Sequence, residues 1–383
     1  MKLAFFTSIV PDGNPTTGFE IANEAILGGL RDLGHEVVVF GFALPRQNID
    51  ASRKDIVVLD TRELENSSAG AVGKLNWLIQ AMRYGLPFAA GKLADFSGAR
   101  LDSEIANAGP FDGYVLNSYQ MAAAFPQLTE HPYIYVAHNV EHQSAIQNAV
   151  AAGSGLQRQL YRRDAKLLKP LEAKLTGGAN FVWTFSEEDI TALQLKADRS
   201  ATLPLYIPQR DDADADKMYD AGLIGTWSWQ PNFIGLQWFI EQVVPLVPST
   251  MKIAVAGSVA ADSLPEIPHV ELLGRVESAA AFLNSVLVVP LVSQGGTGVQ
   301  LKTIEAFQSG YPCVATSSSL RGIEDLPPNC LRADDPQAFA EALVALVGQL
   351  KSGKLSRVDG SEFLARQKAA LINGIKQGLV CLT

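Results

Sequence analysis

The chain has 383 residues, 47% hydrophobic and 19% charged, which is enough for two hydrophobic cores. Its formal net charge of −9 at pH 7 disfavours nucleic acid as a partner. No apolar run reaches the length of a membrane span and no signal-peptide pattern follows Met1, so we expect a cytoplasmic enzyme. The three cysteines lie too far apart for a CxxC metal site, so we expect reduced thiols.

The N-terminal residues predict a strand, a helix and a second strand. Leu3 to Val10 is an apolar run that is typical of a parallel strand. Thr17 and Glu20 have the spacing of a capping box, which predicts a helix from there to Leu33. Val37 to Phe40 then predicts the next strand, so the chain opens with one βαβ unit.

The next segment with a clear pattern is KLNWLIQAMRYGLPF, residues 74–88, which predicts a helix with one apolar face. A core-facing helix is the common interpretation of such a pattern, and a helix that borders an acceptor is the alternative. Strands are predicted at Gly113 to Asn117 and at Tyr133 to Ala137.

The second of these strands ends at His138, and His142 follows. A His-x3-His pair on a helix can bind zinc, but no third ligand is evident in the sequence. Open α/β sheets bind ligands at the carboxyl ends of their strands, which makes His138 a candidate ligand-facing residue. A histidine that only caps the following helix is the alternative.

A basic helix is predicted from Leu156 to Lys174, where six Lys and Arg side chains accompany only two carboxylates. A solvated helix face is the common explanation, and contact with an anionic membrane or a lipid diphosphate is the alternative. Phe181 to Phe185 predicts a further strand, and Ser186 caps the helix after it.

An acidic, Pro- and Ala-rich segment, LPLYIPQRDDADADKMYDAG, predicts a domain boundary. Its Asp-x-Asp patterns at Asp212, Asp214 and Asp216 lie in this hinge, where we expect solvated carboxylates and no metal. The second half then predicts strands at Gly222 to Gly225 and at Met251 to Ala256. Its helices are predicted from Phe233, at Gln337 to Leu350 and at Gly360 to Ile375.

The most informative stretch is residues 285–316, which predict strand, glycine loop, helix, turn and strand. After the strand Ser285 to Leu291, the loop QGGTG allows a ligand to approach the backbone, and the following helix directs its positive end at an anion. Lys302 and Glu305 lie on one face of that helix. Leu301 replaces the third Gly of the dinucleotide fingerprint, and no Gly-Lys-Ser/Thr is present. A tight turn with a surface Lys–Glu pair is the alternative.

The whole stretch, PL-x3-GGTG-x2-LK-x2-EA-x3-G-x-P-x-VAT, resembles the nucleotide-sugar site of glycosyltransferases with the GT-B architecture, in particular the retaining family 4 enzymes. This resemblance implies an α/β fold of two Rossmann-like parallel-sheet domains facing across a cleft. Residues 1–207 would form the acceptor-side domain and residues 208–365 the nucleotide-sugar-binding domain. Residues 366–383 would form a helix that crosses back to the first domain.

The resemblance also implies roles for individual residues. Lys302 would contact the donor diphosphate, Glu305 the ribose hydroxyls, and His138 would line the cleft beside the donor sugar. Lys302 and His138 are therefore the candidate catalytic residues. The other candidate donor-binding residues are Gly18, Thr226, Arg275, Val276, Gly296, Thr297, Gly298 and Val299. Residues 272–276 (LLGRV) resemble the family's turn whose backbone contacts the nucleobase.

Three departures from the family pattern remove charged groups. Thr297 stands where the family often has a glutamate, and Thr226 stands where it commonly has an arginine. Several residues after Gly225, where the family commonly has a lysine, this chain has Gln230-Pro231-Asn232. Lys302 and backbone amides would therefore carry more of the diphosphate binding.

The implied reaction is transfer of a sugar from a UDP- or GDP-linked donor to a saccharide or polyprenyl-linked acceptor, with retention and with neither cofactor nor metal. The expected setting is polysaccharide or glycoconjugate biosynthesis in the cytoplasm or at the inner face of the membrane. Two alternatives are a nucleotide-sugar 2-epimerase or hydrolase on the same fold, and a non-catalytic partner that binds sugar nucleotides.

Overall fold

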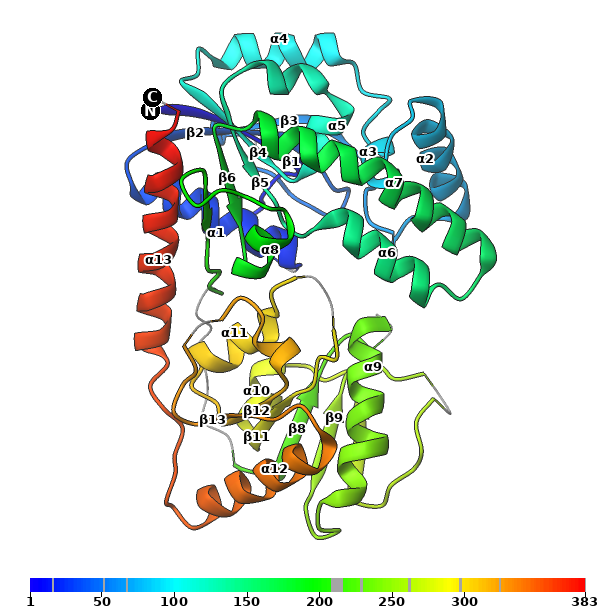
Figure 1. Ribbon diagram of the computed structural model, residues 1–383, viewed down its shortest axis with the longest axis vertical. Coiled ribbons are helices and arrows are strands. Elements are labelled where there is room, and N and C mark those ends of the chain that lie inside the picture. The colour runs from blue at the N-terminus through cyan, green and yellow to red at the C-terminus, as the bar shows by residue number, and fades with distance from the viewer. Residues whose placement is uncertain are drawn as a thin grey trace. The chain divides into compact units, whose positions relative to one another are not determined.

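A computed structural model of the chain describes residues 1–15, 17–50, 52–66, 68–207, 216–227, 230–260, 263–295, 298–323 and 325–382. These residues form two compact units (Figure 1). The first unit comprises Met1–Leu205 and Lys368–Thr383, and the second comprises Tyr206–Gln367.

The first unit is described with a seven-stranded parallel sheet, in the order β3-β2-β1-β4-β5-β6-β7. The chain moves outward from β1 to β3 and then returns to β4 on the other side of β1, so the strand order reverses between β1 and β4. Ligands bind beside such a reversal in open α/β sheets. The strands are β1 (Lys2–Ile9), β2 (Glu36–Ala43), β3 (Ile56–Thr61), β4 (Gly113–Asn117), β5 (Tyr133–Val136), β6 (Phe181–Thr184) and β7 (Ser200–Thr202).

The helices of the first unit include the predicted one with a capping box. The Glu20 N–H donates to Thr17 Oγ1 over 3.3 Å, and the Thr17 N–H donates to Glu20 Oε2 over 2.9 Å, which confirms the prediction. The helices are α1 (Gly18–Asp32), α2 (Ala71–Arg83), α3 (Phe88–Gly91), α4 (Gly98–Ala108), α5 (Tyr119–Ala124), η1 (Pro126–Glu130), α6 (Glu141–Ala151), α7 (Gly155–Gly178) and α8 (Glu187–Ala192).

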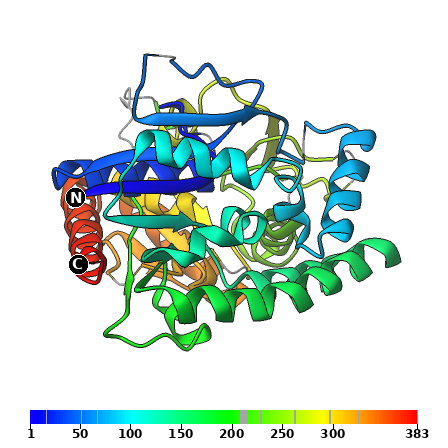
Figure 2. The same ribbon diagram turned by 90° about the horizontal axis from the view of Figure 1, so that it is seen from above.

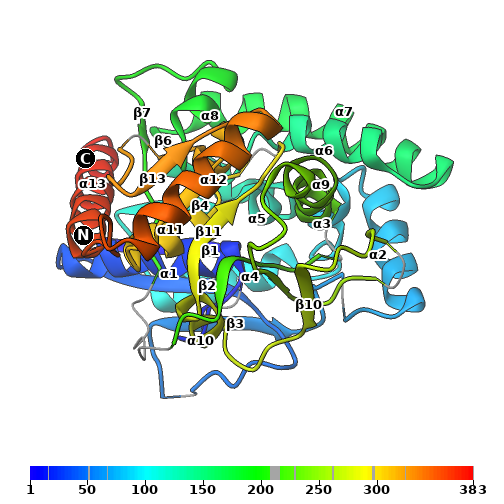
Figure 3. The same cartoon turned by 90° about the horizontal axis from the view of Figure 1, so that it is seen from below.

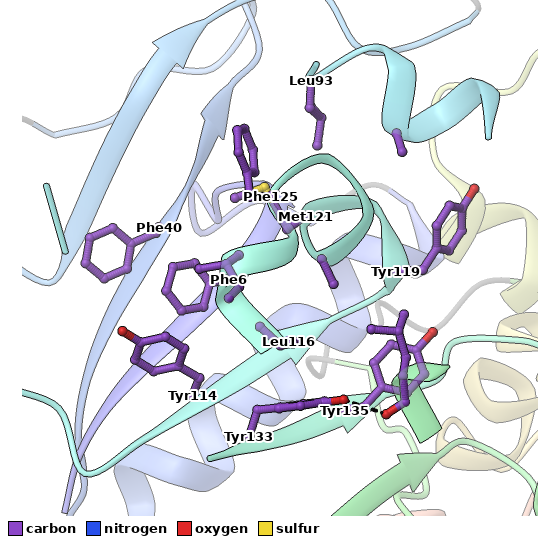
Figure 4. Packing of buried hydrophobic residues seen from close by; sticks show 14 of the residues in the cluster. Phe6, Phe40, Leu93, Tyr114, Leu116, Tyr119, Met121, Phe125, Tyr133 and Tyr135 are labelled. Carbon is purple, nitrogen blue, oxygen red and sulfur yellow. Dashed lines mark hydrogen bonds between the residues drawn. The ribbon is translucent and has the colours of Figure 1, made fainter. Parts of the chain in front are cut away.

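Aromatic side chains form much of the core on one face of this sheet (Figure 4). Phe6 on β1 stacks on Phe40 of β2 with ring centroids 5.2 Å apart, and it meets Tyr114 of β4 at 4.9 Å. Tyr133 donates its hydroxyl proton to the Leu175 carbonyl over 2.9 Å, so its polar end is satisfied inside the core. This packing fixes β1, β4 and β5, the strands whose carboxyl ends carry the candidate residues of this unit.

The second unit is described with a six-stranded parallel sheet, in the order β10-β9-β8-β11-β12-β13. Helices α11 and α12 pack on it beside β11 (Figure 3). The strands are β8 (Tyr219–Ile224), β9 (Ile253–Ala256), β10 (Val270–Gly274), β11 (Val286–Leu291), β12 (Cys313–Ala315) and β13 (Cys330–Arg332). The helices are α9 (Gln230–Trp238), η2 (Phe239–Val243), η3 (Val244–Leu246), α10 (Ala279–Asn284), α11 (Leu301–Gln308), η4 (Ser317–Leu320) and α12 (Pro336–Lys351).

The last helix, α13 (Ser361–Val380), begins in the second unit and ends in the first. Near its start, the Phe363 ring meets Phe307 edge-on at 5.6 Å. Further along, the Trp183 indole N–H donates to the Gly374 carbonyl over 3.0 Å. A Cβ on Gly29 of α1 would lie 2.5 Å from the Cδ1 methyl of Ile375, so a larger residue there would have to displace side chains of α13.

The predicted strand, helix and strand over residues 285–316 are confirmed as β11, α11 and β12. Two expectations are corrected. Leu272 to Gly274, expected as a turn, is the end of strand β10, because it pairs in parallel with β9. The core-facing interpretation of α2 fails for most of its apolar residues: only Trp77 and Ala81 are buried.

Candidate functional site

Three glycines bring the carboxyl ends of β8, β9 and β10 together in the second unit. Gly257 has φ +110° and its N–H donates to the Gly274 carbonyl over 2.6 Å. A Cβ on Gly257 would lie 2.0 Å from the Gly225 carbonyl oxygen, so only glycine fits. Gly225, Gly257 and Gly274 thus form a surface of backbone without side chains, which a ligand can approach closely; we call this surface the floor of the site.

Lys302 lies over this floor. Its Nζ is 5.0 Å from the centroid of the Trp227 ring, and a Cβ on Gly225 would lie 2.8 Å from Nζ. The Trp227 indole N–H donates to the Ala256 carbonyl over 2.8 Å, which fixes the ring. Burial lowers the pKa of Lys302 to about 8, partly opposed by the negative charge of Glu305. The cation is thus held with little water around it.

Lys302 is the second residue of helix α11, so the N-terminus of this helix lies at the same place. Its N-cap residue, Gln300, makes no side-chain hydrogen bond to the first turn, so among the described residues the N-cap side chain leaves that turn's N–H groups uncapped. The positive end of a helix favours an anion at this place. Gln300, Lys302, Glu305, Trp227, Asn232 and Ser319 are among the residues that line one shared pocket.

A network of hydroxyl groups ties Ser293, just after β11, to the segment after β12 and to α11. The Ser293 N–H donates to Ser319 Oγ over 2.9 Å, and the Thr316 hydroxyl donates to the Ser293 carbonyl over 2.5 Å. The Thr303 hydroxyl of α11 donates to the Ser319 carbonyl over 2.6 Å. The start of α11 is therefore tied to the carboxyl ends of β11 and β12, which gives Lys302 and Glu305 a rigid base.

The remaining candidates of this unit lie around the floor with fewer contacts. Thr226 is exposed, and its carbonyl accepts a hydrogen bond from Asn232 Nδ2 over 3.1 Å. Arg275 is exposed and Val276 half-buried, directly after Gly274. Gly298 and Val299, both half-buried, precede α11, whereas residues 296–297 (Gly296 and Thr297) lie outside the described part of the chain. The acidic hinge at 208–215 is also outside it.

In the first unit, His138 follows the carboxyl end of β5 between two phenylalanines. Phe19 of α1 lies 4.8 Å from the imidazole, centroid to centroid, and Phe185 lies 4.9 Å from it. Burial lowers the pKa of His138 to about 3, so the ring is neutral at physiological pH. Gly18, the exposed first residue of α1, adjoins Phe19, and the structure therefore brings Gly18 and His138 to the same edge of the sheet.

A chain of amide hydrogen bonds fixes the tautomer of His138. Asn23 Nδ2 donates to the Ile9 carbonyl over 3.2 Å; because a carbonyl only accepts, this assigns the amide nitrogen. Asn23 Oδ1 then accepts from Asn117 Nδ2, which leaves Asn117 Oδ1 facing His138 Nε2 over 2.8 Å. His138 must therefore carry its proton on Nε2. Its Nδ1 keeps a lone pair and can accept a hydrogen bond.

Glu141 is a second titratable group at this edge. Burial, reinforced by the negative charge of Glu172, raises the pKa of Glu141 to about 7. Glu172 accepts hydrogen bonds from the Glu141 N–H over 2.6 Å and from His142 Nδ1 over 2.6 Å. His138 and His142 thus bond to different partners and do not converge on a common point.

Asn23, Asn117, Glu141 and Trp227 were not predicted as site residues. Asn117 had one signal in the sequence, since it is a polar residue that closes the apolar strand β4 (GYVLN). Glu141 and Trp227 had none, because their roles follow from contacts with distant segments.

Within the described ranges, no group of three or more His, Cys, Asp or Glu side chains could hold a metal ion. No described helix has the length and apolar character that crossing a membrane requires.

Comparison with known proteins shows which family the second half of the chain resembles. Residues 220–349 match the family model of glycosyl transferases group 1. This part of the chain is therefore similar to a group 1 glycosyl transferase domain. It contains β11, α11, Lys302 and Glu305, so the predicted resemblance is confirmed over these residues. No curated protein sequence matches the chain.

Solved structures extend the similarity to the full length at the level of fold. Sucrose-phosphate synthase from Thermosynechococcus elongatus has a TM-score of 0.62 and 13% identity, covering 99% of this chain and 96% of its own. HepE (Alr3699) of Anabaena, in complex with UDP-glucose, has a TM-score of 0.58, 12% identity and 99% coverage of both chains. WaaG, a glycosyltransferase involved in lipopolysaccharide biosynthesis, has a TM-score of 0.57 and 13% identity, covering 98% of this chain and 94% of its own. The predicted GT-B fold, with one Rossmann-like parallel sheet in each unit, is confirmed.

Proposed function

We propose that the chain is a glycosyltransferase that uses a nucleoside-diphosphate sugar, UDP- or GDP-linked, as its donor. The observation that carries the proposal is the surroundings of Lys302. A poorly hydrated ammonium group, a helix N-terminus that its N-cap residue Gln300 leaves uncapped, and closely packed glycine backbone occur together there. Each of these features favours an anion, and a diphosphate is an anion large enough to meet all three.

The chemistry of transfer matches these groups. When the sugar leaves, negative charge grows on the diphosphate, and fixed donors aimed at that charge stabilise the transition state. Lys302 would supply the positive charge that stabilises the leaving diphosphate. Glu305 would accept hydrogen bonds from the ribose hydroxyls. The peptide groups of Arg275 and Val276, just after β10, would contact the nucleobase. Neutral His138 would accept a hydrogen bond from a hydroxyl of the donor sugar through Nδ1. No step requires a metal or a cofactor, and we propose retention of configuration.

Solved relatives support the choice of donor and acceptor. HepE was crystallised with UDP-glucose and with UDP and glucose together. A TarM variant of S. aureus was crystallised with UDP, fondaparinux and α-GlcNAc-glycerol. By analogy with these proteins, we propose a saccharide or a polyprenyl-linked saccharide as the acceptor, in the biosynthesis of a polysaccharide or glycoconjugate.

The first experiment is a thermal-shift series with UDP, GDP and ADP, followed by transfer assays with sugars on the nucleotide that stabilises the protein. Lys302→Ala should lower turnover by about 10²–10³-fold, the usual loss when one stabiliser of developing charge is removed. Activity should survive excess chelator, because no metal is part of the proposed step.

Other outcomes would redirect the assignment. Donor incubated alone that yields an epimer or free sugar would indicate an epimerase or hydrolase, and nucleotide binding without turnover would indicate a non-catalytic binding protein. Loss of activity with EDTA and rescue by Mn²⁺ or Mg²⁺ would contradict the proposed mechanism.

A further inference from the structure

Helix α2 presents an apolar stripe to solvent. Its four large aliphatic residues on the outer side have the spacing i, i+3, i+7, i+10, which places them on one face of the helix. Trp77 and Ala81, on the opposite face, are the buried residues of this helix. The outer residues and their exposed fractions are Val72 (83%), Leu75 (58%), Ile79 (53%) and Met82 (48%).

Helix α7 carries a basic stripe next to α2. Arg158, Arg162, Lys166 and Lys169 are exposed, and their spacing places them on one face. In the part of the chain that the structure describes, none of the four forms an ion pair with a carboxylate. Exposed apolar residues extend the surface at the corner between α6 and α7, at Ile146, Val150 and Leu156.

Hydrogen bonds join the two helices into one surface. The Arg163 guanidinium of α7 donates to the Ala81 carbonyl in the last turn of α2 and to the Leu86 carbonyl, each over 2.9 Å. The Phe88 N–H, just after α2, donates to Asp164 Oδ2 over 3.0 Å. Figures 1 and 2 both show α2 beside the first half of α7. The apolar and basic stripes are therefore held in a fixed relation.

The charge of this region has the opposite sign to that of the chain. Residues 71–94 and 142–174 contain nine Lys and Arg residues and two carboxylates, whereas the whole chain has a net charge of −9. Both carboxylates are engaged within the fold, Asp164 by the Phe88 N–H and Glu172 by His142. Asp60 and Asp95, which line a pocket beside α2, form ion pairs with Arg62. The exposed charge within the two ranges is therefore almost entirely positive.

We propose that α2 and α7 form a docking surface for an anionic lipid bilayer, with the apolar stripe of α2 in the headgroup region and the basic stripe of α7 on lipid phosphates. An amphipathic helix with neighbouring cations has this chemistry. A second copy of the chain fits less well, because two copies would bring like charges together. Nucleic acid would leave the aliphatic stripe in water. This surface does not depend on the proposed transfer reaction.

The test is sedimentation of the full chain with vesicles of phosphatidylglycerol and phosphatidylcholine, or of phosphatidylcholine alone, at low and high salt. The wild type should bind the anionic vesicles at low salt and be released at high salt. Each Lys or Arg near an anionic surface contributes roughly fivefold to binding, so Arg162→Glu with Lys166→Glu should weaken binding about 25-fold or more. Leu75→Ser with Ile79→Ser should weaken it about tenfold or more.

Matched controls lie in the second unit. Leu272→Ser and Lys354→Glu replace exposed residues of the same types and should leave binding unchanged. All changed side chains are exposed, so the variants should melt like the wild type, which calorimetry can check.

Three results would overturn the proposal. They are no binding to anionic vesicles at low salt, equal binding to neutral vesicles, and full binding by the Leu75/Ile79 variant. A wild-type dimer in light scattering that this variant converts to a monomer, without vesicle binding, would assign the apolar stripe to a second copy instead.

Discussion

Binding of a nucleoside diphosphate should make Lys302 take up a proton. In the ligand-free protein, burial beside Trp227 and Gly225 lowers the pKa of Lys302 to about 8. A diphosphate in contact with the ammonium group favours the charged form, and should return the pKa to roughly its ordinary value near 10.5. Uptake should then be about 0.5 proton per ligand at pH 8 and about 0.9 at pH 9. Both pH values lie above the second pKa of a phosphate group, so the ligand itself contributes little to the proton uptake.

Titration calorimetry measures this uptake directly. At one pH, the binding enthalpy of UDP or GDP should vary with the ionisation enthalpy of the buffer, and the slope gives the number of protons. Lys302→Met keeps the aliphatic stem over Trp227 and removes the titrating group, so its slope should be near zero. A wild-type slope near zero at pH 8, or an equal slope in the variant, would refute the assignment of the anion site to Lys302.

The same pKa makes a prediction for stability. A lysine with a lowered pKa binds fewer protons in the folded state than in the unfolded state between about pH 8 and 10.5. The free energy of unfolding should therefore rise with pH across this window. Below the window, the folded protein bears the full cost of burying the charged ammonium group of Lys302. A shift of this size corresponds to about 3 kcal/mol. Lys302→Met should accordingly melt higher than the wild type at pH 7 without ligand.

Three further predictions concern neighbouring groups. Glu305→Ala should raise the KM for the donor in initial-rate assays and leave kcat nearly unchanged, because a ribose contact is the same in the ground and transition states; a fall in kcat with constant KM would contradict this role. Asn117→Asp should place a carboxylate against His138 Nε2 and raise the pKa of His138 from about 3, seen as a change of its ¹⁵N shifts with pH near neutrality; unchanged shifts would argue against the amide chain. Glu141, with a folded pKa of about 7 against an ordinary 4.5, binds more protons when folded, so stability should fall as pH rises across that interval, by up to about 3 kcal/mol. Glu141→Gln should remove this fall in urea denaturation at pH 5 and pH 8, and an unchanged fall would assign it to another group.

The sequence predicted the central strands of both sheets and missed the outer ones. Strands β1, β4, β5, β8, β9 and β11 are apolar runs buried on both faces, which local pattern reveals. The four missed strands, β3, β7, β10 and β13, are the edges of the two sheets as described. An edge strand exposes part of its length and carries polar residues, so its pattern resembles that of a loop. Only pairing with a neighbour identifies it.

Helix α2 shows a second limit of sequence patterns. Its periodicity correctly predicts a helix, but apolar residues occur on two sides of it, with Val72, Leu75 and Ile79 outside and Trp77 inside. Hydrophobic spacing does not state which side meets the core. That choice depends on Arg163, Asp164 and the segment they hold, which lie far away in the sequence.

The site residues show the same limit: some of their properties follow from local sequence, and others depend on distant segments. Lys302 and Glu305 were identified from one local motif, whereas the charge states of Lys302 and His138 depend on distant segments. Burial lowers the pKa of both side chains, yet the consequences differ because the values do. At about 3, the pKa of His138 lies so far below neutrality that a nearby anion would leave the ring uncharged. At about 8, the pKa of Lys302 leaves the side chain mostly charged at pH 7, but between about pH 8 and 10 a bound diphosphate would decide its charge. In that pH range the charge of Lys302 should follow occupancy of the site, whereas His138 should remain a neutral hydrogen-bond acceptor throughout.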